Sequence, residues 1–117
     1  MTISANAYRV KKNDYWKKYW PDIQAIRQLI SADPSATLFT PAEVGFGVGA
    51  DRITNDSTLG FYSKEERKFI VTDSFRQDRL WPWFADTHPD IYAHIQKKLK
   101  AGHLIYEGHY YKVYSSS

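Results

Sequence analysis

The sequence predicts a single α+β domain over residues 1–117, with two or three helices packed on antiparallel β-hairpins at about 58–73 and 103–114. Apolar residues recur at helical spacing in some segments and alternate along others, which is the pattern of helices mixed with half-buried strands. The length of 117 residues suits one modest core. The composition, 43% hydrophobic and 25% charged, is that of a globular chain.

The first predicted helix covers residues 14–32, and Asp14 is placed to cap its start. Apolar residues such as Ile23 and Ile26 then fall on one stripe at helical spacing. Pro21 disfavours the helical conformation of the residue before it, so we expect the helix to kink or restart there.

A second, short helix is predicted to begin beside Thr40, which can act as its cap. Pro41 suits the first helical position, and Glu43 completes a capping box. The glycines at positions 45, 47 and 49 weaken any regular structure directly after this start. They do not form a phosphate-binding loop, because the lysine of a P-loop and the glycine spacing of a dinucleotide site are both absent.

The middle of the chain predicts a β-hairpin made of two strand-like runs, Thr58–Ser63 and Arg67–Asp73. Asp73 can then cap a short helix that runs to Leu80 and that Pro82 stops.

The most clearly marked helix begins at Pro89 and ends before Gly102. Ile91, Ile95 and Leu99 form an apolar stripe with a spacing of four residues. Glycine is a common residue just past a helix end, so both limits of this helix are predicted from local signals.

A final hairpin is predicted from His103–Tyr106 and His109–Tyr114, around Glu107 and Gly108. If those two residues form the whole loop, alternate side chains sort onto two faces. The better core face holds Leu104, Tyr106, His109, Tyr111 and Val113, whereas the other face holds His103, Ile105, Tyr110, Lys112 and Tyr114. A three-residue loop would change this pairing.

Several classes of protein are excluded or disfavoured by composition. The chain has no cysteine, which excludes a disulfide framework, a cysteine nucleophile and a cysteine-rich zinc site. No apolar run approaches bilayer length, and the first twelve residues lack the apolar region of a signal peptide. We therefore expect a cytoplasmic protein with no membrane partner. The four histidines lack the spacing of metal ligands, so no metal or cofactor is expected.

Glu107 lies between His103 and His109 and forms the one compact group in the sequence that combines a carboxylate with imidazoles. Exposed turn residues produce the same pattern by chance, and no nucleophile motif accompanies it. No residue is therefore assigned a catalytic role, and we lean against an enzymatic function.

Charge is distributed unevenly, although the net charge is only +3. Residues 1–30 carry six basic and two acidic side chains, residues 31–89 carry six and nine, and residues 90–117 carry four and two. Basic ends beside an acidic middle hint at an acidic or polyanionic partner, but at this net charge a mixed, solvated surface is the favoured interpretation.

Basic and aromatic residues interleave near both ends of the chain. Lysines neutralise phosphates and aromatic rings stack on bases, but tyrosine, tryptophan and long basic stems also anchor protein interfaces. The candidate binding residues are Tyr15, Trp16, Lys17, Lys18, Lys97, His103, Tyr110, Lys112 and Tyr114. The structural alternative is that the rings fill the core while the lysines keep the surface soluble.

These observations favour a small non-enzymatic binding protein with a macromolecular partner, which we expect to be a protein more readily than a nucleic acid. An inhibitor or adaptor of a nucleic-acid-processing assembly fits the size and the basic, aromatic ends. A domain that binds DNA or RNA directly is the alternative, and a small hydrolase or nuclease ranks third. The sequence does not determine the oligomeric state.

Overall fold

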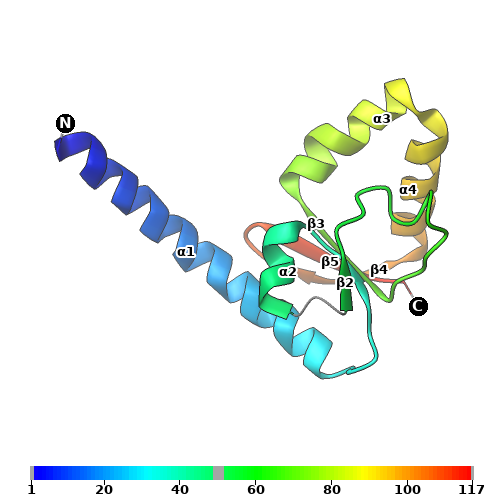
Figure 1. The fold of residues 1–117 in the computed structure, drawn as a ribbon, viewed down its shortest axis with the longest axis horizontal. Helices are drawn as coiled ribbons and strands as arrows, with labels where there is room; N and C mark the ends of the chain where they lie inside the picture. The colour runs from blue at the N-terminus through cyan, green and yellow to red at the C-terminus, as the bar shows by residue number, and fades with distance from the viewer. Residues whose placement is uncertain (1, 49–51, 117) are drawn as a thin grey trace.

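The computed structural model describes the backbone of residues 2–48 and 52–116, and the side chains of residues 17–45 and 52–116. Within these limits, helices flank a five-stranded mixed sheet (Figure 1). The predicted α+β class is therefore confirmed, although the sheet is not built from two hairpins as the sequence indicated.

The sheet has the strand order β2-β1-β3-β5-β4. The strands are β1 Leu38–Phe39, β2 Ile53–Thr54, β3 Phe69–Asp73, β4 His103–Glu107 and β5 Tyr111–Ser115. β1 pairs in parallel with both β2 and β3, whereas β5 pairs antiparallel with β3 and β4. β3 is thus the central strand on which the parallel and antiparallel halves meet.

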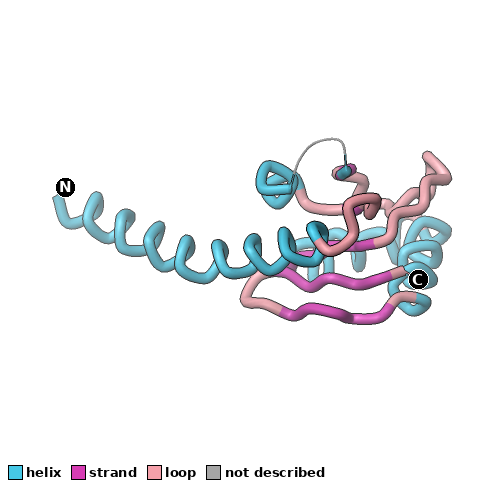
Figure 2. Tube along the Cα trace, turned by 90° about the horizontal axis from the view of Figure 1, so that it is seen from below, coloured by secondary structure: helices cyan, strands magenta, loops and turns pink. Residues whose placement is uncertain are grey.

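The helices are α1 Thr2–Ser31, α2 Ala42–Val48, α3 Trp81–Thr87 and α4 Pro89–Ala101, with a π-helical segment, η2 Arg76–Leu80, leading directly into α3. Figures 1 and 2 both show the N-terminal part of α1 extending away from the rest of the chain. Its C-terminal part supplies the side chains that pack on the sheet.

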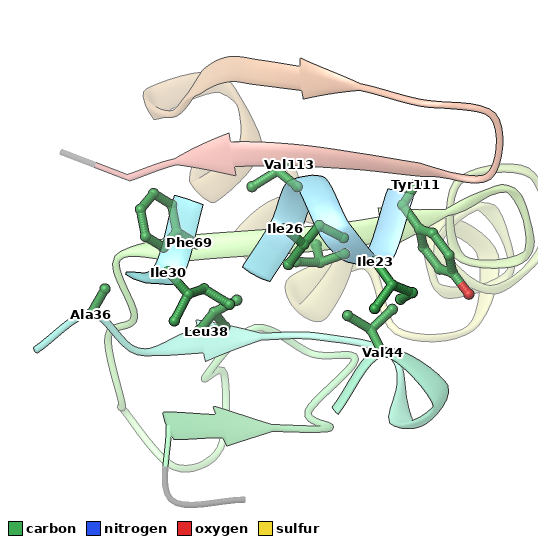
Figure 3. Close-up of a cluster of buried hydrophobic side chains, with 10 residues drawn as sticks. Ile23, Ile26, Ile30, Ala36, Leu38, Val44, Phe69, Tyr111 and Val113 are labelled. Atoms are coloured by element: carbon green, nitrogen blue, oxygen red, sulfur yellow. The ribbon is translucent and has the colours of Figure 1, made fainter. Parts of the chain in front are cut away.

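The two faces of the sheet carry separate cores, because successive side chains of a strand point to opposite sides. One core lies between the sheet and the helices α1 and α2, and Figure 3 shows its isoleucines from α1 meeting side chains of β1, β3 and β5. It contains Ile23, Ile26, Ile30, Ala36, Leu38, Val44, Phe69, Val71, Tyr111 and Val113. The other core lies under α3 and α4 and contains Phe39, Leu59, Ile70, Trp81, Phe84, Ile91 and Ile95.

The predicted hairpin at 58–73 is wrong. Residues 57–63 form consecutive turns, and β3 pairs with β1 and β5 instead of with them. The carboxylate of Asp56 organises these turns by accepting hydrogen bonds from the backbone N–H of Thr58, at 2.9 Å, and of Gly60, at 3.0 Å. A local aspartate turn therefore took the place of the first predicted strand.

The C-terminal strands β4 and β5 do pair antiparallel, but with a three-residue loop, 108–110, in place of the predicted two-residue one. Tyr106 pairs with Val113, and Leu104 pairs with Tyr114, with an irregularity between them. This bulge places Leu104 and Tyr106 on opposite faces of the sheet, so the predicted grouping of side chains is only partly right.

α1 differs from its prediction at both points that depended on local signals. It begins at Thr2, so that Asp14 lies inside the helix, and it continues without interruption through Pro21. Burial of the stripe after Pro21, where Ile23, Ile26 and Ile30 are each at most 2% exposed, outweighs the local cost of the proline.

The helix after β3 begins as predicted, because Asp73 accepts a hydrogen bond from the backbone N–H of Arg76 at 2.9 Å. Pro82 does not stop it. Instead, η2 widens the helix immediately before the proline, and the N–H of Trp81 bonds to the carbonyl of Arg76, five residues back. The wider turn accommodates a residue that lacks an N–H and whose ring would crowd an α-helical carbonyl.

The remaining two helix starts were predicted correctly in position. α4 has Pro89 at its first position, buries Ile91 and Ile95, and ends at Gly102. α2 begins at Ala42, but the expected capping box is absent, because the Thr40 hydroxyl donates to the carbonyl of Pro41. The glycines do not end α2 at once, since it extends to Val48; the last of them, Gly49, lies outside the described residues.

Candidate functional site

A buried carboxylate on α1 holds the loop between β4 and β5. Asp22 is 1% exposed and accepts hydrogen bonds from three successive backbone N–H groups, those of His109 at 3.2 Å, Tyr110 at 2.8 Å and Tyr111 at 3.3 Å. The hydroxyl of Tyr106 donates a fourth hydrogen bond to it at 2.7 Å. Consecutive N–H groups form a concave anion site, which here is filled from within the chain.

Two neighbours of Asp22 depend on this contact. A Cβ at Gly108 would collide with the carboxylate, so the loop needs a residue without a side chain at that position. Burial and the hydrogen bond to Asp22 raise the pKa of Tyr106 to about 12, because both disfavour its ionised form. Tyr106 therefore remains a hydrogen-bond donor throughout the physiological pH range.

A second contact joins α1, α2 and β5 beside the first. The Tyr19 hydroxyl donates to the backbone carbonyl of Glu43 at 2.8 Å, and the Tyr111 hydroxyl donates to the Glu43 carboxylate at 3.0 Å. The rings of Tyr19 and Tyr111 meet edge to face with centroids 6.0 Å apart. The stretch of α1 around Tyr19 and Asp22 is thus fixed to β5 by the Tyr19–Tyr111 contact and to the 108–110 loop by the Asp22 carboxylate.

These contacts bring residues from both ends of the sequence to one edge of the molecule. Lys18 lies one helical turn before Asp22, on the side of α1 from which Asp22 bonds to the 108–110 loop. Its side chain is exposed, that of Tyr110 is half-buried, and that of His109 is exposed. We call Lys18, His109, Tyr110 and Lys112 the loop edge.

A cavity of about 230 Å³ opens next to the loop edge, between the loop and the start of η2. Its walls combine hydroxyl, amide, carboxylate, imidazole and ammonium groups. The lining residues are Thr72, Asp73, Ser74, Gln77, Asp78, Gly108, His109, Tyr110, Tyr111 and Lys112. The cavity lining is thus part polar and part apolar, as is usual for sites that take a side chain of a partner.

The predicted binding residues do not form one group. Tyr110 lies in the 108–110 loop and Lys112 just after it in β5, Lys17 and Lys18 lie on α1, and Lys97 is exposed on α4. Tyr15 and Trp16 lie within α1, and their side chains are outside the described ones.

Two further predicted binding residues also lie elsewhere. Tyr114 is half-buried against the α3–α4 core and accepts a hydrogen bond from Gln77 at 3.4 Å. His103 begins β4, at the end of the strand remote from the 108–110 loop, and is exposed. Tyr110 and Tyr114 do not share one face as predicted, because Tyr110 lies in the loop outside β5 and packs against the α1–α2 core, whereas Tyr114 in β5 packs against the α3–α4 core.

The sequence cluster of Glu107 with two histidines is not assembled in space. Glu107 pairs with Lys112 at 3.8 Å, His103 lies at the other end of β4, and the backbone of His109 bonds to Asp22. Over residues 17–45 and 52–116, the structure has no group of three or more potential metal ligands. In the same part of the chain, no helix combines the length and hydropathy required to cross a membrane.

Sequence reasoning missed three residues that the structure makes prominent. Asp22 interrupts the apolar stripe of α1 one turn before Ile26, and a carboxylate in such a stripe is the signal that could have identified it. Phe75 and Trp83 are 57% and 51% exposed on the helix formed by η2 and α3. Nothing in their local sequence distinguishes them from the buried Trp81 and Phe84.

Comparison with known proteins adds no functional information: no family model matches the chain, and no curated protein or solved structure is similar to it.

Proposed function

We propose that this chain is a small, non-enzymatic binding protein that engages an acidic protein surface through its loop edge. The observation that carries the proposal is the set of hydrogen bonds between Asp22 and the 108–110 loop, which hold Tyr110 against α1, where Lys18 lies one helical turn before Asp22. Lysines at the rim and a tyrosine at the centre are a common arrangement in protein interfaces.

The loop edge is preorganised for binding. The three N–H groups that define its backbone conformation are already bonded to a buried carboxylate, so little ordering remains to be done when a partner arrives. The cavity beside it provides space for one side chain of that partner. An inhibitor or adaptor of a nucleic-acid-processing assembly, acting in the cytoplasm, is the role we assign to such a protein.

The test is a quantitative pull-down from nuclease-treated native cell extract with three proteins: the natural chain, Lys18→Glu with Tyr110→Ala, and Lys97→Glu. We expect a specific protein whose recovery falls at least tenfold with the double variant. Lys97→Glu is the matched control, because this lysine is also exposed but lies on α4. The proposal fails if no protein is retained, or if Lys97→Glu reduces recovery as much as the double variant.

Fluorescence anisotropy distinguishes direct binding of nucleic acid from binding of a protein partner. It uses labelled single-stranded DNA, duplex DNA and RNA of about twenty nucleotides. Phosphate contacts lose affinity steeply as salt rises. If the protein binds tightly at 50 mM salt, more weakly at 200 mM, and not at all with Lys18→Glu, the partner is a nucleic acid and not a protein. Absence of binding at 50 mM salt supports the protein partner.

A further inference from the structure

η2 and α3 form one continuous helical rod (Figure 1). The rod exposes large aromatic side chains on one side while it buries others on the opposite side. Trp81 and Phe84 are only 2% and 8% exposed, so the inner side of the rod is well packed. Phe75 and Trp83 are 57% and 51% exposed. Their exposure is therefore a property of the outer side and not a sign of a loose helix.

The exposed residues follow one line along the rod. Arg79 lies four residues after Phe75 and four before Trp83, and Asp86 follows Trp83 by three, which are the spacings of neighbours on a helix surface. All four side chains are exposed. We call Phe75, Arg79, Trp83 and Asp86 the outer stripe.

The Trp83 ring is held in place by its neighbours. Its centroid lies 5.3 Å from that of Phe84 and 5.7 Å from that of His88. A ring fixed in this way loses little side-chain entropy when a partner covers it, which is the property of an interface anchor.

Acidic side chains lie on and beside the outer stripe, and one of them, Asp78, also lines the cavity between η2 and the 108–110 loop. Asp78, Asp86 and Asp90 are exposed, and among the described residues none of these three carboxylates has a hydrogen bond or ion pair. Arg79 is the one basic residue of the outer stripe. Because exposed carboxylates outnumber basic groups here, such a surface repels phosphates and favours a basic partner.

From the exposed aromatic side chains and the unpaired carboxylates, we propose that the outer stripe docks onto a basic protein surface, with Phe75 and Trp83 entering an apolar groove that lysine or arginine side chains flank. This goes beyond the proposed function, because the stripe belongs to the α3–α4 side of the sheet and the loop edge includes a lysine of α1 on the other side. The chain then carries two surfaces that select partners of opposite charge, as an adaptor requires.

The test uses two synthetic amphipathic helical peptides with the same leucine positions, one with lysine and one with glutamate at every polar position. Titration of each into isotopically labelled full-length protein is followed by two-dimensional NMR. We expect the lysine peptide to shift the amide signals of the outer stripe and the glutamate peptide to leave them unchanged. Trp83→Ala and Phe75→Ala should each weaken binding at least tenfold, and neutralising Asp78, Asp86 and Asp90 to asparagine at least fivefold.

Tyr62→Ala is the matched control, because Tyr62 is an even more exposed aromatic residue, at 69%, in the loop before β3. It should bind the lysine peptide with unchanged affinity. Equal binding of both peptides, no binding of either, shifts centred away from the stripe, or an equal loss with Tyr62→Ala would each overturn the proposal. So would a dimer in sedimentation experiments that Trp83→Ala dissociates, since the stripe would then serve a second copy of the chain.

Discussion

At the scale of single residues, Asp22 is the position on which most polar contacts converge. Its carboxylate accepts three backbone N–H groups and one tyrosine hydroxyl, and removing it leaves these donors without their partner. We expect Asp22→Ala to lower the free energy of unfolding by about 3 kcal/mol, as is typical when a buried charged acceptor is lost. Urea unfolding measures this change.

The control for this prediction is Asp33→Ala, which removes a carboxylate that is paired with Lys68 at the surface. Exposed ion pairs contribute little to stability, so its effect should be much smaller. If the two variants unfold at the same urea concentration, the hydrogen bonds of Asp22 do not hold the loop.

The hydrogen bond from Tyr106 to Asp22 is lost at strongly alkaline pH, when the tyrosine ionises. Its pKa rises from 10.0 to about 12 in the folded protein, so its contribution to stability is complete below pH 10 and is lost as the pH rises through 12. Tyr106→Phe lacks this contribution at every pH. The difference in unfolding free energy between the natural protein and Tyr106→Phe should therefore shrink from pH 9 to pH 12, and a constant difference would contradict this assignment.

At the scale of elements, the turns that replaced the predicted first hairpin contain backbone strain. Lys64 has a φ of 61°, in the left-handed region that costs an ordinary residue about 1 kcal/mol. Lys64→Gly removes the strain together with the contact between its ammonium and the Phe61 ring, 5.2 Å from the ring centroid. Lys64→Ala removes only the contact.

We therefore expect Lys64→Gly to be about 1 kcal/mol more stable than Lys64→Ala. Thermal and urea unfolding of both variants give this difference directly, and the shared loss of the lysine cancels. Equal stability of the two variants would show that the loop relaxes to another conformation.

The helix whose start, apolar stripe and end all lie within its own sequence was predicted well, whereas the strands that depend on distant partners were not. The helix at Pro89–Ala101 has its proline start, apolar stripe and glycine end within its own sequence. β3 pairs instead with β1, about thirty residues earlier, and with β5, about forty residues later, and no local pattern encodes those partners. The continuation of α1 through Pro21 also depends on packing that only the folded sheet supplies.

At the scale of the whole molecule, part of the candidate site could be predicted and part could not. The basic and aromatic character of the two ends is visible in composition, and Tyr110 and Lys112 line one cavity. The separation of Tyr110 from Tyr114 follows from the three-residue loop 108–110, which leaves Tyr110 outside β5 and packed against the α1–α2 core. The sequence leaves open whether this loop has two or three residues.

The sheet also connects the two cores, and this gives a last prediction. Ile26 and Ile95 are both fully buried, one on each side of the sheet. Each isoleucine truncated to alanine should lower the unfolding free energy by about 2–5 kcal/mol. Because β1, β3 and β5 are shared by both layers, we expect one cooperative transition in each variant.

The measurement compares far-ultraviolet circular dichroism, which follows all helices, with tryptophan fluorescence, to which the buried Trp81 of the α3–α4 core contributes. In Ile26→Ala the fluorescence transition should move to lower urea together with the dichroism, although Ile26 lies in the other core. Ile95→Ala serves as the reference for a substitution on the same side as Trp81. If Ile26→Ala shifts only part of the dichroism and leaves the fluorescence midpoint unchanged, α1 unfolds separately and the loop edge is less firmly held than the hydrogen bonds of Asp22 imply.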